Sequence, residues 1–252
     1  MSGRVWVERG GRLGWVVIDS PERRNALTAE MFRQLAEGLA ELDADDGVRV
    51  LVLRGAGDKA FASGADIGDL GAVSRSPSPS PSAPLVSARK PIVAMIHGSC
   101  IGGGLLVALG ADIRIAADDA RFGIPAVRLG VAYPYDGVRQ VVAAAGPSAA
   151  GEILLTGSTF GAEDARRWGL VSRVVPAAEL ESTVVAVATA IADGAPLSVH
   201  AAKSSIRAAL AGSPPDLVED AEAAIRACWG SADFEEGRRA FAEKRTPTFR
   251  GR

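Results

Sequence analysis

The chain has 252 residues, 48% hydrophobic and 23% charged, which excludes a disordered protein and allows one globular unit with a large core. The formal charge of −2 comes from basic residues dispersed among acids, so we expect no binding to nucleic acid or to a membrane surface. No stretch reaches the roughly 18 to 20 apolar residues of a membrane helix, and the N-terminus has no continuous apolar region. These features predict a cytoplasmic protein.

Cysteine and histidine are too few and too scattered for a disulfide framework or a metal site. The two cysteines, Cys100 and Cys228, and the two histidines, His97 and His200, lack the spacing of metal ligands. We therefore expect no bound metal.

Strand and helix patterns alternate in the first half of the chain. Residues 4–8 and 12–19 are β-branched and aromatic runs around a glycine turn, which predicts a hairpin. Thr28 precedes an amphipathic segment and is expected to cap its helix. The apolar runs 48–53 and 91–96 predict buried parallel strands, and the alternation favours an α/β fold.

Residues 74–84 contain a Ser-Pro repeat that should interrupt any helix or ladder, so we predict a mobile segment there. Since the apolar strands on both sides look like one sheet, an insertion is favoured over a linker between domains. After about residue 146 the sequence becomes helical and alanine-rich, with helices predicted at 147–155, 162–168, 177–192, 196–211, 215–229 and 232–243. We divide the chain into a core of residues 1–195 and a C-terminal helical region of residues 196–252.

A strand, a glycine-rich turn and a helix are predicted across residues 91–109, with Gly102, Gly103 and Gly104 at the turn. The first N–H groups of a helix lack intrahelical acceptors and carry the positive end of its dipole, so they suit a developing oxyanion. Glycines used only for close strand–helix packing explain the same pattern. The loop at residues 59–67 also follows an apolar strand, and two such loops can supply two donors to one oxygen. Losing one donor typically costs about 3 to 4 kcal/mol of transition-state stabilisation.

Motifs along nearly the whole chain resemble the enoyl-CoA hydratase/isomerase (crotonase) family. They are Glu22-Arg-Arg-Asn-Ala-Leu27, Phe61-Ala-Ser-Gly-Ala-Asp-Ile67, His97-Gly98 with Gly102-Gly-Gly104, Ala111-Asp-Ile-Arg-Ile-Ala116, Arg121-Phe-Gly-Ile-Pro125, Leu155-Thr-Gly157 with Ala162-Glu-Asp-Ala165, Gly169-Leu-Val-Ser-Arg-Val-Val175 and Phe241-Ala-Glu-Lys-Arg245. The resemblance implies a spiral of ββα units with C-terminal helices used in oligomerisation, and a homotrimer or a dimer of trimers. It also implies an acyl-CoA substrate, with coenzyme A as part of the substrate and no tightly bound cofactor.

By the same resemblance, the N–H groups of Ala65 and Gly103 would form an oxyanion hole. The coenzyme A groove would be lined by Arg23, Arg24, Ala26, Asp66 and Ile67, while Phe241 and Lys244 would reach the nucleotide, with another subunit as one possible source. The cationic side chains among these residues suit phosphate through charge-assisted hydrogen bonds. Solvated surface charge is the alternative for each of them.

Two positions depart from the hydratases of the family. Those enzymes carry one glutamate three residues after the oxyanion glycine and another after the proline of the Phe-Gly-x-Pro motif, where this chain has Leu106 and Ala126. Hydration needs groups that activate water and handle the α-proton, and neither leucine nor alanine can do so. The sequence therefore argues against standard hydration and against standard isomerisation.

Two polar residues follow in a stretch that is usually small and glycine-rich in the family. Tyr133 resembles a tyrosine of the family's methylmalonyl-CoA decarboxylases, in which loss of carbon dioxide generates an enolate without a base. Asp136 could act as a base or a nucleophile. A tyrosine hydroxyl satisfied at the pocket edge, and an aspartate that caps a helix from Gly137, are the structural alternatives.

We therefore expect an enzyme that forms an enolate from an acyl-CoA thioester, by decarboxylation or by isomerisation, with Tyr133 or Asp136 handling the proton. Two further functions compete with this enolate chemistry. Gly98-Ser-Cys100-Ile-Gly102 resembles a nucleophile elbow with cysteine in place of serine, which would suit hydrolysis with His200 as the base. Loss of both glutamates would also fit a non-catalytic acyl-CoA-binding protein. His97 precedes the turn, and we expect it to be packed and hydrogen-bonded.

Overall fold

The computed structural model describes residues 3–64 and 80–252 and contains two sheets. The larger sheet has the order β1-β2-β3-β5-β7-β10, formed by Arg4–Gly10, Leu13–Asp19, Val50–Gly55, Ile92–Ile96, Ile113–Ala117 and Arg173–Val175. Strands β1 and β2 pair antiparallel, and all the remaining neighbours in this sheet pair parallel. The predicted hairpin and the predicted parallel strands are therefore confirmed, and the sheet is mixed.

The smaller sheet has the order β4-β6-β8-β9, formed by Ala60–Ala62, Ser99–Ile101, Arg121–Gly123 and Thr159–Gly161. A strand of the large sheet is followed by one of the small sheet and then by a helix, as in β5, β6 and α4 (Gly103–Leu109). The next such unit contains β7, β8, the 3-10 helix η3 (Pro125–Arg128) and α5 (Tyr135–Thr156). This repeat brings the turns at residues 62–64 and 102–104 to neighbouring strand ends, because β4 pairs with β6.

Helix α1 (Ala29–Ala44) begins where the sequence predicts, because the Thr28 Oγ accepts a hydrogen bond from the Met31 N–H at 3.2 Å. Alternate residues of β3 point to opposite faces of the large sheet, and each face packs against a different hydrophobic core. Leu51 and Leu53 join the main core, which also includes the buried face of α1, whereas Val50 and Val52 join a second core under α7 (Leu180–Asp193). Both faces of the central strands are therefore dry, as expected for parallel strands.

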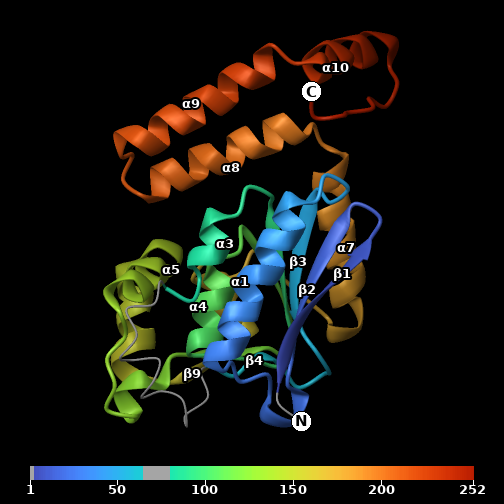
Figure 1. Ribbon diagram of the computed structural model, residues 1–252. Helices are drawn as coiled ribbons and strands as arrows, with labels where there is room; N and C mark the ends of the chain where they lie inside the picture. The colour runs from blue at the N-terminus through green and yellow to red at the C-terminus, as the bar shows by residue number, and fades with distance from the viewer. Residues whose placement is uncertain (1–2, 65–79) are drawn as a thin grey trace.

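The C-terminal helices lie beyond one end of the large sheet (Figure 1). They are α8 (Pro196–Leu210), α9 (Pro215–Trp229) and α10 (Ala232–Glu243), and α8 packs along α9. Hydrogen bonds tie this layer to the sheet: the Lys203 Nζ donates to the Lys90 carbonyl and to Asp112, each at 2.8 Å. Arg49 donates to the carbonyls of Ala192 and Phe249.

Most of the predicted helices are found, including α6 (Ala162–Arg167) and the short η4 (Ala177–Glu179) before α7. The helix predicted at 147–155 is the second part of α5, which is kinked at Gly146 with φ of 73° ahead of a proline. No single helix in the described ranges is long and apolar enough to cross a membrane. In the part of the chain that the structure describes, one bent pair, Ala177–Asp193 and Pro196–Leu210, reaches that length and hydropathy, across a 108° bend.

The Ser-Pro segment was predicted at residues 74–84, of which 74–79 lie outside the described residues. The remainder contains the start of α3 (Ala83–Ser87), so the prediction that these residues interrupt any helix is wrong at its C-terminal end. Pro84 lies in the first turn of α3, where a missing N–H costs no helical hydrogen bond. The strands on either side of it in the sequence, β3 and β5, pair in one sheet.

One buried asparagine joins the loop before α1 to the strand end that precedes β4. The Asn25 side chain is fully buried; its Oδ1 accepts from the Ser20 N–H at 2.8 Å, and its Nδ2 donates to the carbonyls of Ala56 at 3.0 Å and Ala60 at 2.7 Å. These hydrogen bonds join the loop before α1 to the residue after β3 and to the first residue of β4. Asn25 therefore holds the loop around η1 (Pro21–Arg23) against β4.

We expect Asn25→Asp to lower the free energy of unfolding by about 3 kcal/mol or more at neutral pH, because a buried carboxylate would face two carbonyl oxygens. The loss should shrink at acidic pH, where a protonated carboxyl can donate. Urea unfolding of the purified variant measures both effects. The exposed Glu22→Gln is the control and should stay within about 0.5 kcal/mol of wild type. A loss of less than about 1 kcal/mol in the free energy of unfolding of Asn25→Asp would contradict the importance of these hydrogen bonds for stability.

Candidate active site

The glycine-rich turn between β6 and α4 leaves one backbone N–H group, that of Gly103, without an acceptor among the described residues. Gly102 has φ of 56° and ψ of −123°, a conformation that favours glycine, and its N–H donates to the Gly123 carbonyl at 2.8 Å. The Gly102 carbonyl accepts from the N–H groups of Leu105 and Leu106. The N–H of Gly103, the first residue of α4, has no acceptor among the described residues. It is thus available to bind an anion at the positive end of the short helix.

A second backbone segment touches this turn. A Cβ atom on Gly104 would lie 2.3 Å from the Ala62 carbonyl oxygen, so only glycine permits this approach. A Cβ atom on Gly64 would lie 3.5 Å from the Gly103 nitrogen. The two loops that the sequence singled out are therefore in contact. Three predicted site residues, Ala65, Asp66 and Ile67, lie outside the described residues.

The loop predicted to line the coenzyme A groove lies against the same segment. The Leu27 N–H donates to the Gly64 carbonyl at 2.8 Å, and the Ser63 N–H donates to the Arg24 carbonyl at 3.0 Å. Arg23 and Arg24 are exposed and Ala26 is half-buried. The structure thus brings the loop that carries Arg23, Arg24 and Ala26 against Ser63 and Gly64, the segment that contacts the glycine turn.

A cavity of about 230 Å³ opens next to that loop, lined by Pro21, Glu22, Arg24, Asn25, Ala56, Asp58, Lys59 and Ala60. Sequence reasoning did not assign a role to Lys59. Lys59 is the first residue of the motif at residues 59–67 and the one lysine in this lining. Its place in that motif is the sequence signal that could have marked it as a candidate site residue.

Tyr133 reaches the glycine turn from the loop before α5. Its hydroxyl lies 3.5 Å from the place that a Cβ atom on Gly102 would occupy, and the Gly64 Cα lies 3.8 Å from the same place. No described residue accepts or donates a hydrogen bond at this hydroxyl. Burial, with a smaller contribution from Cys100, raises the pKa of Tyr133, so the hydroxyl stays protonated at neutral pH. The structure therefore places a protonated hydroxyl beside Gly102, and this hydroxyl has no hydrogen-bond partner among the described residues.

The residues at the two positions where the family resemblance predicts hydratase glutamates are buried and apolar. Leu106 is 2% exposed and Ala126 is 7% exposed. A Cβ atom on Gly137 would lie 2.9 Å from a Leu106 methyl group and 3.4 Å from the Tyr133 ring, so these three residues pack together. The wall next to Tyr133 is thus apolar.

Asp136 is not brought to the turn by any described contact. It is exposed in the first turn of α5, where its charge favours the helix dipole. The helix begins at Tyr135 with Pro134 at the N-cap position, so the alternative in which Asp136 caps a helix from Gly137 is wrong. A catalytic role for Asp136 stays a prediction.

The residues of the hydrolase alternative do not form a catalytic pair. Cys100 is fully buried in β6, and this burial raises the pKa of its thiol, so the reactive thiolate is disfavoured. His200 lies in α8, and no interaction within the described chain joins it to Cys100. The arrangement indicates packing of Cys100 rather than nucleophilic chemistry. No three histidine, cysteine, aspartate or glutamate side chains gather in the described ranges as metal ligands would.

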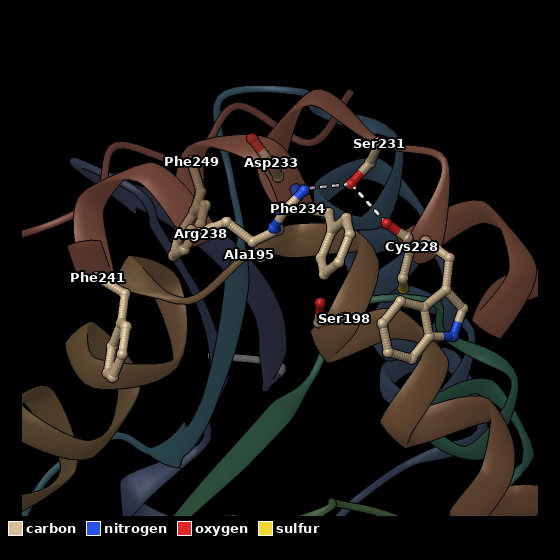
Figure 2. A pocket seen from close by; sticks show the side chains of 11 residues that line it. Ala195, Ser198, Cys228, Ser231, Asp233, Phe234, Arg238, Phe241 and Phe249 are labelled. Carbon is tan, nitrogen blue, oxygen red and sulfur yellow. Dashed lines mark hydrogen bonds between the residues drawn. The ribbon is translucent and has the colours of Figure 1, made fainter.

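The last two predicted site residues, Phe241 in α10 and Lys244 at its C-terminal cap, lie in the C-terminal layer, far from β4 in Figure 1. A larger cavity, of about 490 Å³, lies in this layer and shares no residue with the glycine turn. Figure 2 shows its aromatic lining, with the Ser231 Oγ accepting from the Phe234 N–H and donating to the Cys228 carbonyl. Within one chain, Phe241 and Lys244 are therefore separate from the turn.

Comparisons with known proteins agree along the whole chain. A family model described as enoyl-CoA hydratase/isomerase matches residues 8–252. The chain belongs to the enoyl-CoA hydratase/isomerase family. Its relatives include the (E)-benzylidenesuccinyl-CoA hydratase of Thauera aromatica, 36% identical over 98% of this chain and 99% of that protein. The carnitinyl-CoA dehydratase of Escherichia coli K12 is 32% identical over the full length of both chains.

Solved structures of the family support the fold. The crystal structure of an enoyl-CoA hydratase/carnithine racemase from Magnetospirillum magneticum matches with a TM-score of 0.89 at 34% identity, over 98% of this chain and 96% of that one. The two mixed sheets followed by C-terminal helices are thus the crotonase fold, and the α/β spiral of ββα units predicted from the sequence is confirmed. The family acts on coenzyme A thioesters, so an acyl-CoA substrate follows from membership.

His97, directly before the turn, is packed as predicted, but its Nε2 has no hydrogen-bond partner among the described residues. Burial lowers the pKa of His97. The carboxylates of Asp119 and Asp58 and the Gly57 backbone oppose this change, and the Arg54 guanidinium reinforces it. The neutral imidazole is therefore the form that fits the fold.

Since the pKa of His97 is lower in the folded than in the unfolded chain, its contribution to stability should be complete above about pH 6.5 and should decrease as the pH falls below that value. One such group contributes a slope of at most about 1.4 kcal/mol per pH unit. Urea unfolding between about pH 8 and pH 5 should show a smaller slope for His97→Gln than for wild type. His200→Gln is the matched control for loss of an imidazole. An unchanged slope in His97→Gln would contradict the assignment.

Proposed function

We propose that this chain converts an acyl-CoA thioester into an enolate held by the N–H groups of Gly103 and Ala65, and that Tyr133 delivers the proton that ends the reaction. The observation that carries the proposal is the position of the Tyr133 hydroxyl beside Gly102, without a partner in residues 3–64 and 80–252, in a site where Leu106 and Ala126 are apolar. The site thus has donors for an oxyanion and a proton donor, but no carboxylate at either hydratase position.

Decarboxylation of a malonyl-type thioester fits this set of groups best. The bond from the α-carbon to the carboxylate carbon breaks, carbon dioxide leaves, and the electron pair forms the enolate, whose oxygen the two N–H groups stabilise. The Tyr133 hydroxyl then gives its proton to the α-carbon and is reprotonated by water. No base is needed. The apolar wall of Leu106 and Gly137 favours loss of a charged carboxylate as neutral carbon dioxide.

The relatives favour hydration or dehydration as a second candidate reaction. A hydratase and a dehydratase are 36% and 32% identical to this chain over nearly its whole length. Hydration would require a carboxylate from elsewhere, and Asp136 is the candidate in the loop that carries Tyr133. Isomerisation of a 3-enoyl thioester has the same requirement for a base.

A panel of thioesters separates these reactions. We expect release of carbon dioxide from malonyl-CoA or methylmalonyl-CoA and little hydration of crotonyl-CoA by the purified protein. Hydration of crotonyl-CoA near diffusion-limited rates would overturn the proposal. Tight binding of malonyl-type, 2-enoyl and 3-enoyl thioesters without any product would instead favour the non-catalytic acyl-CoA-binding protein.

Removing one hydroxyl tests the proton donor. Tyr133→Phe should lower kcat for decarboxylation by about 100-fold or more while the Kd of a non-reactive acyl-CoA stays within about twofold, because the ring still packs on Gly137. The control is Tyr135→Phe, since Tyr135 is 79% exposed two residues further along. Equal kcat values in wild type and Tyr133→Phe would exclude Tyr133 as the donor.

The C-terminal layer supports the proposal of a homotrimer or a dimer of trimers. Its described helices expose large apolar side chains, namely Ile206 at 59%, Leu210 at 63%, Trp229 at 67% and Phe241 at 89%, and the cavity of Figure 2 lies beside the last two. Phe241 and Lys244 would then serve the nucleotide of another subunit.

Sedimentation equilibrium should give about three or six times the chain mass of 25.9 kDa. In that assembly, Lys244→Ala should raise the KM for acyl-CoA without changing kcat. A monomer with full activity would contradict this part of the proposal.

A further inference from the structure

Residues 244–252 fold back along α10 (Figure 1), and a buried aspartate in the first turn of that helix holds the end of this segment. The Asp233 carboxylate accepts hydrogen bonds from the N–H groups of Arg250 and Gly251, each at 2.7 Å. The Asp233 N–H donates in turn to the Arg252 carbonyl at 3.2 Å. Since Asp233 is only 4% exposed, these hydrogen bonds are shielded from water and fix the segment to the start of α10.

Glu236, one turn further along α10, holds the middle of the same segment. Its carboxylate accepts two hydrogen bonds from the Arg245 guanidinium, at 2.6 and 2.9 Å, and one from the Thr248 N–H at 3.0 Å. The Arg245 guanidinium, followed by Arg239 and the Thr248 backbone, holds the pKa of Glu236 well below its usual range. The Glu236 side chain is 13% exposed. It is therefore an ionised and largely shielded acceptor for this segment.

The turn between α10 and this segment carries a cation without an acidic partner among the described residues. Each arginine between residues 232 and 245 pairs with a glutamate of α10, whereas no described carboxylate forms an ion pair with the Lys244 ammonium. Lys244 has φ of 54°, a left-handed conformation that residues other than glycine rarely adopt without support. The next residue is Arg245, so its ion pair with Glu236 supports the turn.

The same segment also joins α10 to the rest of the chain. The Arg49 Nη2 donates to the Phe249 carbonyl at 2.7 Å, and the Arg49 Nη1 donates to the Ala192 carbonyl at 3.0 Å. The Phe249 ring packs on α10, because a Cβ atom on Gly237 would lie 3.6 Å from it. The two hydrophobic cores contain no described residue beyond Ala192. The position of α10 therefore depends on polar contacts of this kind.

We propose that Glu236, together with Asp233, is a positioning residue for coenzyme A, because it holds the turn from which Lys244 binds the nucleotide phosphates. This inference rests on the proposed role of Phe241 and Lys244 toward the nucleotide of another subunit. Glu236 acts through Arg245 and touches no substrate. Its carboxylate neutralises the neighbouring arginines and leaves the Lys244 ammonium for phosphate, which a charge-assisted hydrogen bond suits.

Two thioesters with the same acyl group separate nucleotide binding from the rest of the site. The probes are butyryl-CoA and S-butyrylpantetheine, which lacks the nucleotide and its phosphates. The readout is Kd by calorimetry, at protein concentrations where sedimentation gives the wild-type mass. Wild type should bind the coenzyme A thioester at least about tenfold more tightly than the pantetheine thioester. A purely structural loss would weaken the binding of both probes alike and leave this preference unchanged.

Glu236→Gln should reduce the preference at least about threefold, because an amide carries no charge to pair with Arg245. The Kd of S-butyrylpantetheine should stay within about twofold. Lys244→Ala should reduce the preference at least as far. The matched control is Glu235→Gln, since the Glu235 side chain is 67% exposed and its hydrogen bonds go to an arginine within α10. Glu235→Gln should keep the preference.

Arg245→Lys is the second variant, in case Glu236→Gln does not fold. It keeps the charge but cannot donate two parallel hydrogen bonds to Glu236, so the preference should fall about twofold or more. If Lys244→Ala loses the preference and the folded variant of Glu236 or Arg245 keeps it, this inference is overturned and the proposed nucleotide contact stands. An unchanged preference in Lys244→Ala would overturn both. Neither result bears on the enolate chemistry, which the thioester panel tests.

Discussion

The contact between the Ala62–Gly64 backbone and the Gly102–Gly104 turn is the constraint on which the rest of the site depends. The Ala62 carbonyl occupies the space that a side chain at Gly104 would need, so the two segments approach as closely as backbones can. This approach leaves the Gly103 N–H at the surface of the turn. The pairing of β4 with β6 fixes the approach, and Asn25 holds the neighbouring loop by hydrogen bonds to Ala56 and Ala60.

The surroundings of the turn strengthen these backbone donors. Fixed N–H groups stabilise developing negative charge most strongly where water is excluded and no reorganisation is needed. The apolar contacts of Leu106, Gly137 and the Tyr133 ring provide such a wall. Burial also raises the pKa of Tyr133 and keeps its hydroxyl protonated at neutral pH, as the proposed role of proton donor requires. In the proposed reaction, one apolar wall would serve both the oxyanion and the proton donor.

Local signals in the sequence predicted the regular elements well. The hairpin, the Thr28 cap and α10 follow from residue type and periodicity within a few positions, and each was found where it was expected. The start of α3 was missed because a Ser-Pro repeat hides the fact that proline is tolerated in a first helical turn. The start of α5 at Tyr135 was missed for a similar reason, since Pro134 occupies its N-cap position.

The site was predicted only in part, because its parts meet through the fold. The glycine motif and the family resemblance identified Gly103 and Tyr133, whose proximity the structure supplies. No spacing rule connects Arg49 to Phe249, which are 200 positions apart, or Asn25 to Ala60. Hydrogen bonds between such distant residues depend on how sheets and helices stack, so sequence periodicity carries no signal for them.

The packing of Leu106 against Gly137 has a consequence for how members of this family change reaction. A glutamate placed at position 106 would point into the wall formed by Gly137 and the Tyr133 ring, where its burial would raise its pKa and hold it neutral. Such a carboxyl could not act as a base until the facing helix also changed. The residues at positions 106, 133 and 137 are therefore expected to be epistatic, so that a change of polarity in this wall requires concerted substitutions on α4, on α5 and in the loop before α5.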